Sequence, residues 1–306
     1  MAEGPQASTL ELSYRKKAPV TDYPPLRPIG LALVRATEIM GAEPYFHEFI
    51  AGVEQVVRPA GYSVLLNVLP NSNAEIATYR RWSADGEVSG VILVDLVIDD
   101  PRPQLVRSLG LPAIVVGPPS AASGFRAVWT NDDTAMRDAV EYLARLGHTR
   151  IAHVGGPDKL LHTRIRRDVF LRECERLGIE AVVQNGDYSR ESGGRCMRTL
   201  CAQWEQPTAA ILDNDLMALG ALDTTRELGI SVPGGFSLLA WDDSAQCQLS
   251  EPTLSAVSHD VLVIGMLTGQ GMLEEIVVAS AQSIASPPVV IITRESTGAP
   301  LPVITT

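Results

Sequence analysis

Two short acidic segments each follow an apolar run, and their side chains are suited to bind a ligand rich in hydroxyl groups. Asp213-Asn214-Asp215 comes directly after the run 209–212, and Asp242-Asp243 comes after the run 236–241. Hydrogen bonds to an ionised carboxylate are roughly twice as strong as neutral ones. Ligands of open α/β sheets bind at the carboxyl ends of the strands. We therefore expect both segments to face one cleft, with Asp242 ionised and accepting hydrogen bonds from hydroxyl groups.

The same carboxylates can also be interpreted as a metal site or an acid–base pair, but the rest of the chain supports neither. Gly155-Gly156-Pro157 follows an apolar run, yet Pro157 lacks a backbone donor and no phosphate-loop glycine pattern is present. No nucleophile or general base stands out. We expect no enzymatic activity, no metal site and no cofactor. The five histidines, which lack a ligand spacing such as HExxH, are His47, His148, His153, His162 and His259.

Strand-like and helix-like segments alternate along the chain, which predicts an α/β fold with parallel, doubly wound sheets. Ten or so strands suit two sheets better than one. The expected strands are 29–34, 62–69, 88–96, 112–116, 127–130, 151–154, 181–184, 209–212, 237–241 and 289–293. The expected helices begin near residues 46, 74, 103, 132, 164, 192, 216 and 261.

A Gly/Ser/Pro-rich segment, 117–124, precedes a new strand near Val128 and predicts the boundary between two lobes. We expect 1–27 to be a disordered tail or linker. The first lobe is expected to comprise 28–129 with about 258–287, and the second 130–257 with about 288–306. The cleft between two such lobes is the default ligand site.

Composition narrows the functional classes. The chain has 306 residues and a formal net charge of −11, so it is unsuited to bind DNA by itself, which needs a basic face. No apolar run is long enough to span a membrane, and the first twenty residues lack the apolar core of a signal peptide. We therefore expect a cytoplasmic protein. The four cysteines, expected to be reduced and mostly structural because they lack zinc-finger spacing, are Cys174, Cys196, Cys201 and Cys247.

A series of segments resembles the effector-binding core of the lactose/galactose-repressor family of bacterial transcription regulators. The resemblance runs from about Ile29 to Thr297, and the segments occur in the expected order and spacing. They are Ile29-Gly30-Leu31, Pro44-Tyr45-Phe46, 146–152, Gly155-Gly156-Pro157 with Arg166, 186–189, Ser192-Gly193, 213–220, 228–233, Trp241-Asp242-Asp243, 252–257 and 294–297.

The resemblance implies two lobes of the periplasmic-binding-protein type I fold, joined by a multi-strand hinge, with a sugar or purine effector clamped between them. It also implies a homodimer that reads operator DNA through an N-terminal helix-turn-helix domain. Nothing before Ile29 fits such a domain, so we expect DNA contacts only through a domain missing from this chain. The segment 35–43 is longer than the family's usual turn, and we expect a loop there, bordering the cleft.

Seven residues are the predicted effector contacts, and each has a structural alternative. Asp242 matches a position that holds sugar hydroxyls in relatives; otherwise it caps a turn. Arg166 offers a planar fork to ring oxygens; otherwise it belongs to a surface cluster. Asn214 offers a donor and an acceptor, or caps the following helix, and both roles are compatible. Tyr188 lies where relatives place an aromatic ring, or it packs in the core.

The other three predicted contacts lie on the first helix and before Arg166. Tyr45 is the better contact of the first helix, whereas Phe46 lies on its apolar face. His162 lies in a loop that varies with the ligand in relatives, and the neighbouring Leu160 and Leu161 indicate a less polar pocket than a free hexose demands. We expect an effector of the sugar or nucleoside class. The alternative function is a periplasmic solute-binding protein that delivers a sugar to a transporter.

Overall fold

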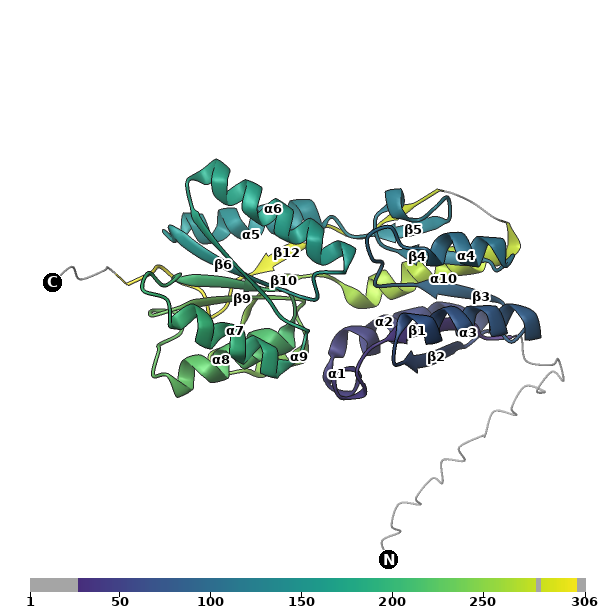
Figure 1. The fold of residues 1–306 in the computed structure, drawn as a ribbon, viewed down its shortest axis with the longest axis horizontal. Coiled ribbons are helices and arrows are strands. Elements are labelled where there is room, and N and C mark those ends of the chain that lie inside the picture. The colour runs from purple at the N-terminus through teal and green to yellow at the C-terminus, as the bar shows by residue number, and fades with distance from the viewer. Residues whose placement is uncertain (1–26, 279–281, 302–306) are drawn as a thin grey trace, which may run out of the picture.

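The computed structural model describes residues 27–278 and 282–301, so the predicted tail, apart from Arg27, lies outside the described residues. Two α/β lobes lie side by side along the long axis of the molecule (Figure 1). Each contains one six-stranded sheet. The predicted fold class, two doubly wound lobes of the periplasmic-binding-protein type, is confirmed.

The first sheet has the strand order β11-β5-β4-β3-β1-β2, and its pairings are all parallel. Four helices cover its two faces: α2 and α10 on one, α3 and α4 on the other. The strands are β1 (Ile29–Val34), β2 (Val64–Leu69), β3 (Gly90–Leu93), β4 (Ala113–Val116), β5 (Arg126–Trp129) and β11 (Ile284–Ala285). The helices are α1 (Thr37–Ala42), α2 (Pro44–Val57), α3 (Ser72–Asp85), α4 (Arg102–Ser108) and α10 (Val261–Val277).

The second sheet has the order β12-β10-β9-β8-β6-β7 and differs from the expected parallel sheet at its edge, where β12 pairs antiparallel with β10. Helices α7 and α8 cover one face, and α5 and α6 the other. The strands are β6 (Arg150–Gly155), β7 (Glu180–Asn185), β8 (Ala209–Leu212), β9 (Ser237–Trp241), β10 (Ser255–Ser258) and β12 (Val290–Ile292). The helices are α5 (Asp132–Arg145), α6 (Leu161–Leu177), α7 (Arg190–Cys201), α8 (Asp215–Glu227) and α9 (Ala245–Leu249).

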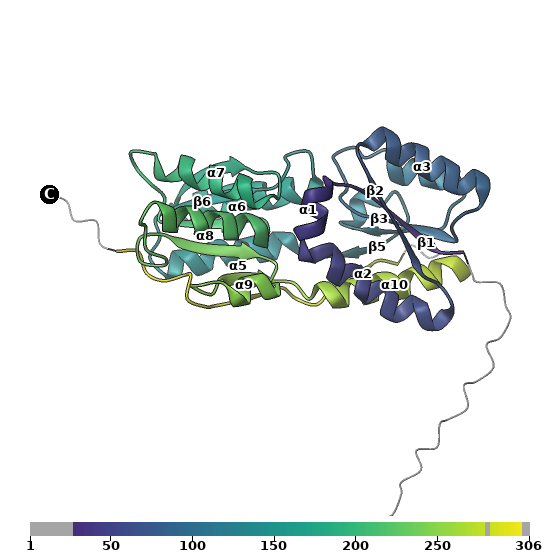
Figure 2. The ribbon, with the colours of Figure 1, turned by 90° about the horizontal axis from the view of Figure 1, so that it is seen from below.

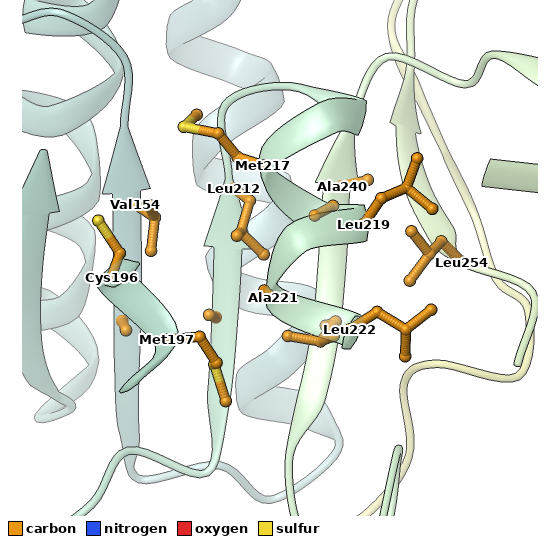
Figure 3. Packing of buried hydrophobic residues seen from close by; sticks show 14 of the residues in the cluster. Val154, Cys196, Met197, Leu212, Met217, Leu219, Ala221, Leu222, Ala240 and Leu254 are labelled. Atoms are coloured by element: carbon orange, nitrogen blue, oxygen red, sulfur yellow. The ribbon is translucent and has the colours of Figure 1, made fainter. Parts of the chain in front are cut away.

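Alternation along each strand explains why helices cover both faces. Ile29, Leu31 and Leu33 of β1 pack against α2 and α10, whereas Ala32 packs against α3. In the second lobe, Leu212 of β8 contributes to the apolar cluster beneath α7 and α8 (Figure 3). Buried apolar side chains of this kind stabilise by roughly 1.5–3 kcal/mol each relative to exposure. The four cysteines are free, as predicted.

The chain crosses between the lobes after β5, after β10 and after β11. As a result α10, late in the sequence, lies beside α2 and the first sheet (Figure 1). Gly52 of α2 and Gly265 of α10 permit this close approach, because a Cβ on Gly52 would lie 2.1 Å from the carbonyl oxygen of Leu262. The first lobe is therefore built from both ends of the described chain.

The prediction of a loop at 35–43 is wrong, because this segment contains the helix α1. The helix has no side-chain cap and is only six residues long, so local sequence gives it little support. Tertiary packing supports it instead: Met40 packs into the first lobe and Ile39 against the core of the second. Figure 2 shows α1 lying between the lobes.

Several expected elements have different bounds, and three short ones were not predicted. The strand expected over 88–96 ends at Leu93, because the backbone turns at Asp95 with φ 50°. The helix expected to begin near residue 192 begins at Arg190. The elements without a counterpart in the sequence analysis, apart from α1, are α9, β10 and β11. They are too short for a periodic pattern to reveal.

Candidate functional site

A cavity of about 260 Å³ lies between the lobes, and all seven predicted contact residues line it. Its walls follow the carboxyl ends of strands from both sheets, as expected for parallel α/β architecture. That these residues contact an effector stays a prediction. The seven are Tyr45, Phe46, His162, Arg166, Tyr188, Asn214 and Asp242.

Three lining residues adopt a left-handed backbone that side chains rarely take. Asp95, Tyr188 and Asp242 follow β3, β7 and β9 respectively, with φ of 50°, 70° and 68°. Such conformations cost on the order of 1–3 kcal/mol each and persist only where the surrounding structure holds them. Backbone strain is therefore concentrated at three strand ends that line one cavity.

Arg166 is tightly held and keeps its charge. Its Nε donates to Asp132 Oδ1 over 2.9 Å, and its guanidinium carbon lies 4.0 Å from the centre of the Trp241 ring. Burial alone would lower the pKa of Arg166, but the carboxylates of Asp132 and Asp213 raise it above the ordinary value. The side chain is buried rather than part of a surface cluster. Its planar fork therefore presents a fixed positive charge to the cavity.

Both acids of the first acidic segment, Asp213 and Asp215, accept hydrogen bonds from within the protein. Asp213 accepts hydrogen bonds from His153 Nε2 at 2.9 Å and from the backbone N–H of Gly156 at 3.1 Å. Asp215 accepts from the backbone N–H of Ser244 at 3.0 Å. These bonds fix the strand-end loops around the cavity. Asn214 and Asp242, which line the cavity as Asp213 does, stay the predicted ligand contacts of the two acidic segments.

Asn214 caps α8, as the sequence allowed, and its contact with an effector stays a prediction. Its side-chain oxygen caps α8 by accepting from the N–H of Met217 at 2.9 Å, while the residue lines the cavity. Its side-chain amide also donates to the backbone carbonyl of Tyr188 at 3.0 Å. The cap therefore ties the start of α8 to the strained turn after β7.

Tyr188 and His162 form a polar pair in the wall of the cavity. The Tyr188 hydroxyl lies 2.7 Å from His162 Nε2 and 3.2 Å from the Thr163 hydroxyl, and the rings of Tyr188 and His162 stack with centroids 6.3 Å apart. Burial, followed by the charge of Arg166, lowers the pKa of His162. The pair is therefore neutral near physiological pH and presents hydrogen-bonding edges to a ligand.

Asp242 differs from the expectation of an ionised carboxylate. Burial, followed by the nearby carboxylate of Asp215, raises the pKa of Asp242 well above its ordinary value. Among residues 27–278 and 282–301, its carboxyl group has no hydrogen-bond or ion-pair partner. A neutral acid both donates and accepts. Asp242 is thus a polar group without a protein partner in the cavity wall.

The first-lobe wall combines aromatic rings with an arginine that the sequence analysis missed. The Arg35 guanidinium carbon lies 5.5 Å from the centre of the Phe46 ring and 5.0 Å from that of Tyr188. Phe46 is also a core residue, only 1% exposed, so its core role is confirmed and its contact with an effector stays a prediction. The ring of Tyr45 stacks on that of Phe49.

Sequence reasoning missed several further lining residues with polar groups. His259 lines the cavity with its Nε2 unsatisfied, and burial lowers its pKa to about 4. The missed polar residues are Arg35, Glu43, Asp95, Asp132 and His259. Four of them lie just after a strand or begin the helix after one, so position relative to the strands was the available signal, whereas Glu43 lies between α1 and α2.

Within the described ranges, no group of three or more His, Cys, Asp or Glu side chains is arranged to hold a metal ion. No described helix is long and apolar enough to cross a membrane.

Comparisons with known proteins agree with this architecture. A family model for a periplasmic binding protein-like domain matches residues 140–297. The chain is 29% identical over 233 residues to the HTH-type transcriptional repressor CytR of Escherichia coli K12, a match covering 73% of this chain and 66% of CytR. The chain thus spans about two thirds of that repressor's length.

Two solved structures extend the comparison. A LacI family transcriptional regulator from Bifidobacterium animalis subsp. lactis is 31% identical with a TM-score of 0.82, covering 90% of this chain and 99% of that one. The transcriptional regulator CelR in complex with cellobiose is 25% identical with a TM-score of 0.80, covering 90% of this chain and 86% of that one.

Proposed function

Because the chain belongs to the LacI family of regulators, which shares the periplasmic binding protein-like domain, we propose that it is the effector-sensing core of a transcription regulator, acting as a repressor. The observation that carries the proposal is the cavity between the lobes, in which Asp242 has no protein partner within the described residues. This carboxyl group is half-buried, so its hydrogen-bonding capacity is open to a ligand in the cavity. The similar proteins named above are transcription regulators, which favours this function over transport.

We propose an effector of the sugar or nucleoside class. Hydroxyl groups of such a ligand suit the mixed donors and acceptors of Asp242, Asn214 and Arg166, while Tyr188 and Tyr45 offer aromatic faces. The carboxylates around the cavity disfavour an anionic effector such as a sugar phosphate. The CelR relative is described with cellobiose, which supports the sugar class.

The proposed regulation follows from the two-lobed architecture. Effector binding changes the angle between the lobes. It thereby shifts the population between DNA-competent and DNA-incompetent arrangements, by no more than the effector's differential affinity for the two states permits. We propose that the lobes are 28–129 with about 258–287 and 130–257 with about 288–306. The protein would act in the cytoplasm as a homodimer. Operator DNA would be bound through a helix-turn-helix domain and not by this acidic core, whose net charge is −11.

A thermal-shift screen tests the proposal. Monosaccharides, disaccharides, nucleosides and sugar phosphates are added to the wild type, to Asp242→Ala and to Asp168→Ala, a matched change at an exposed position of α6. A ligand at about a hundredfold over its dissociation constant stabilises by about 2.7 kcal/mol. We expect a neutral sugar or nucleoside to raise the melting temperature of the wild type and of Asp168→Ala, but not that of Asp242→Ala. A shift that survives in Asp242→Ala would refute the assigned site.

A further inference from the structure

A second cavity, of about 190 Å³, lies between the lobes next to the first. Three residues line both cavities, and all three lie at the ends of first-lobe strands: Arg35 after β1, and Val94 and Asp95 after β3. The side chain of Arg35 therefore stands at the boundary between the cavities.

Four partners hold Arg35 in this position. Its Nη2 lies 3.1 Å from Asp95 Oδ2, and its Nε donates to Glu43 Oε2 over 3.4 Å. Its guanidinium lies between the rings of Phe46 and Tyr188, which belong to different lobes. The side chain is only 10% exposed. A cation so enclosed does not leave its place without losing two ion pairs and two ring contacts.

Backbone contacts between the lobes complete the boundary. The N–H of Leu161 donates to the carbonyl of Leu96 over 2.8 Å, and Val97 and Leu160 form an isolated antiparallel bridge. Leu96 and Leu161 line the first cavity, whereas Val97 and Leu160 line the second. These backbone hydrogen bonds hold the stretch in place. The side chain of Arg35 is therefore the part of the boundary that a substitution can remove.

The second cavity has the chemistry to accept a sugar ring. Polar groups of Ser72, Lys159 and Asp187 reach its lining from both lobes, and Ile39 of α1 and Ile76 of α3 supply apolar surface. Arg102, also in the lining, is already bound by Asp100 and Glu75. A mixture of a few polar groups with apolar surface is typical of small-molecule sites.

We propose that Arg35 is a specificity-determining residue that limits the effector to a single ring and closes off the second cavity as a latent subsite for another ring. This rests on the proposed function of the first cavity. That cavity, at about 260 Å³, lies just below the roughly 300–1,000 Å³ of sites for drug-sized ligands, which suits one ring. The effector class would therefore differ from the two-ring cellobiose named for the CelR relative.

Calorimetric titration tests the proposal with defined probes: glucose and ribose as single-ring ligands, and cellobiose and maltose as two-ring ligands. The variants are Arg35→Ala, and Arg81→Ala as a control at an exposed arginine of α3. We expect wild type and Arg81→Ala to bind a single-sugar probe and reject both disaccharides. Arg35→Ala should bind a disaccharide at least about tenfold more tightly than the wild type does. Wild type that binds a disaccharide as tightly as its best single-sugar probe would overturn the proposal.

A crystal structure of Arg35→Ala gives a readout that needs no ligand. We expect one continuous cavity that reaches from Asp242 to Lys159. If Tyr188 or Asp95 moves to keep the cavities apart, the proposal is overturned. Should no probe bind any variant, the proposed function fails while this structure still decides the role of Arg35.

Asp95→Asn is the second variant if Arg35→Ala does not fold. Asparagine tolerates the left-handed backbone at this position, where φ is 50°. The change removes the carboxylate that anchors Arg35, and we expect disaccharide affinity to rise in the same direction by a smaller factor. Unchanged selectivity in a folded Asp95→Asn whose crystal structure shows Arg35 displaced would contradict the proposal.

Discussion

Arg166 and Asp132 form a buried ion pair, 2.9 Å between Nε and Oδ1, that joins α6 to the start of α5 beneath the cavity. Both side chains are only 11% exposed. The pair gives a rigid positive edge to the site, and it makes the stability of the second lobe depend on a residue predicted to bind effector.

Arg166→Met should be strongly destabilising. It leaves Asp132 as an uncompensated buried carboxylate, which typically costs about 3–5 kcal/mol. Guanidinium denaturation measures the loss. The control is Arg172→Met on the same helix, where the ion pair with Asp133 is solvent-exposed and its loss should barely change stability. Equal stability of the two variants would mean that the Arg166 pair contributes no more than a surface pair.

Asp242→Asn should stabilise the ligand-free protein at alkaline pH. Because the native pKa of Asp242 is raised above its unfolded value of 3.8, the wild type loses stability as pH rises from 3.8 through the native pKa. The asparagine variant lacks this loss. We expect a gain in the free energy of unfolding at about pH 8 and none at about pH 4. Denaturant unfolding at both pH values checks this, and parallel pH profiles would count against it.

His259 should make the protein sensitive to acid. Burial lowers its pKa from 6.5 to about 4, although Asp132 counteracts this and Arg166 and His162 reinforce it. The free energy of unfolding is unaffected by this shift above pH 6.5 and falls as pH decreases toward about 4. The total loss is roughly 3 kcal/mol. His259→Gln should flatten this part of the pH profile. Because Asp242 has the opposite trend, the test is the difference between variant and wild type; identical slopes would refute it.

Gly52→Ala should destabilise the first lobe. Its new Cβ would lie 2.1 Å from the Leu262 carbonyl oxygen, so α2 and α10 must separate, at a cost of about 1–3 kcal/mol. Gly41→Ala is the matched control in α1, because no atom lies within 4 Å of the added Cβ. Urea denaturation compares the two. If both variants unfold at the same urea concentration, the helix contact is looser than described.

Strand-end chemistry was sufficient to predict two of the seven cavity-lining residues, Asn214 and Asp242, whereas the other five were predicted from the family resemblance. Asn214 and Asp242 follow strands with clear apolar runs, and parallel strands bring their carboxyl ends to one edge, so both residues were expected at the cleft and lie there. The sequence did not predict which of these side chains form hydrogen bonds with distant parts of the protein. Asp213 and Asp215 have the same local sequence signal as Asn214, but partners distant in sequence, His153 and Ser244, engage them.

The structure of the segment from Arg35 to Glu43 could not be predicted from the sequence. Helix α1 has neither a side-chain cap nor enough length for a periodic pattern, and its Ile39 packs on a core cluster that the other lobe supplies. The position of Arg35 likewise depends on Tyr188, more than 150 residues away along the chain. Neither fact has a local signal.

The three crossings between the lobes affect how the protein is made. During synthesis β1 to β5 emerge first, yet their sheet lacks the edge strand β11 and the covering helix α10 until nearly the whole chain has left the ribosome. The apolar face of α2 has no partner in that interval. The second lobe can assemble most of its core earlier. The first lobe therefore lacks α10 and β11 until late in synthesis, and of the described strands only β12, at the edge of the second sheet, emerges after them. Until then, the exposed apolar surface of the first lobe makes this nascent form prone to aggregation and to chaperone binding.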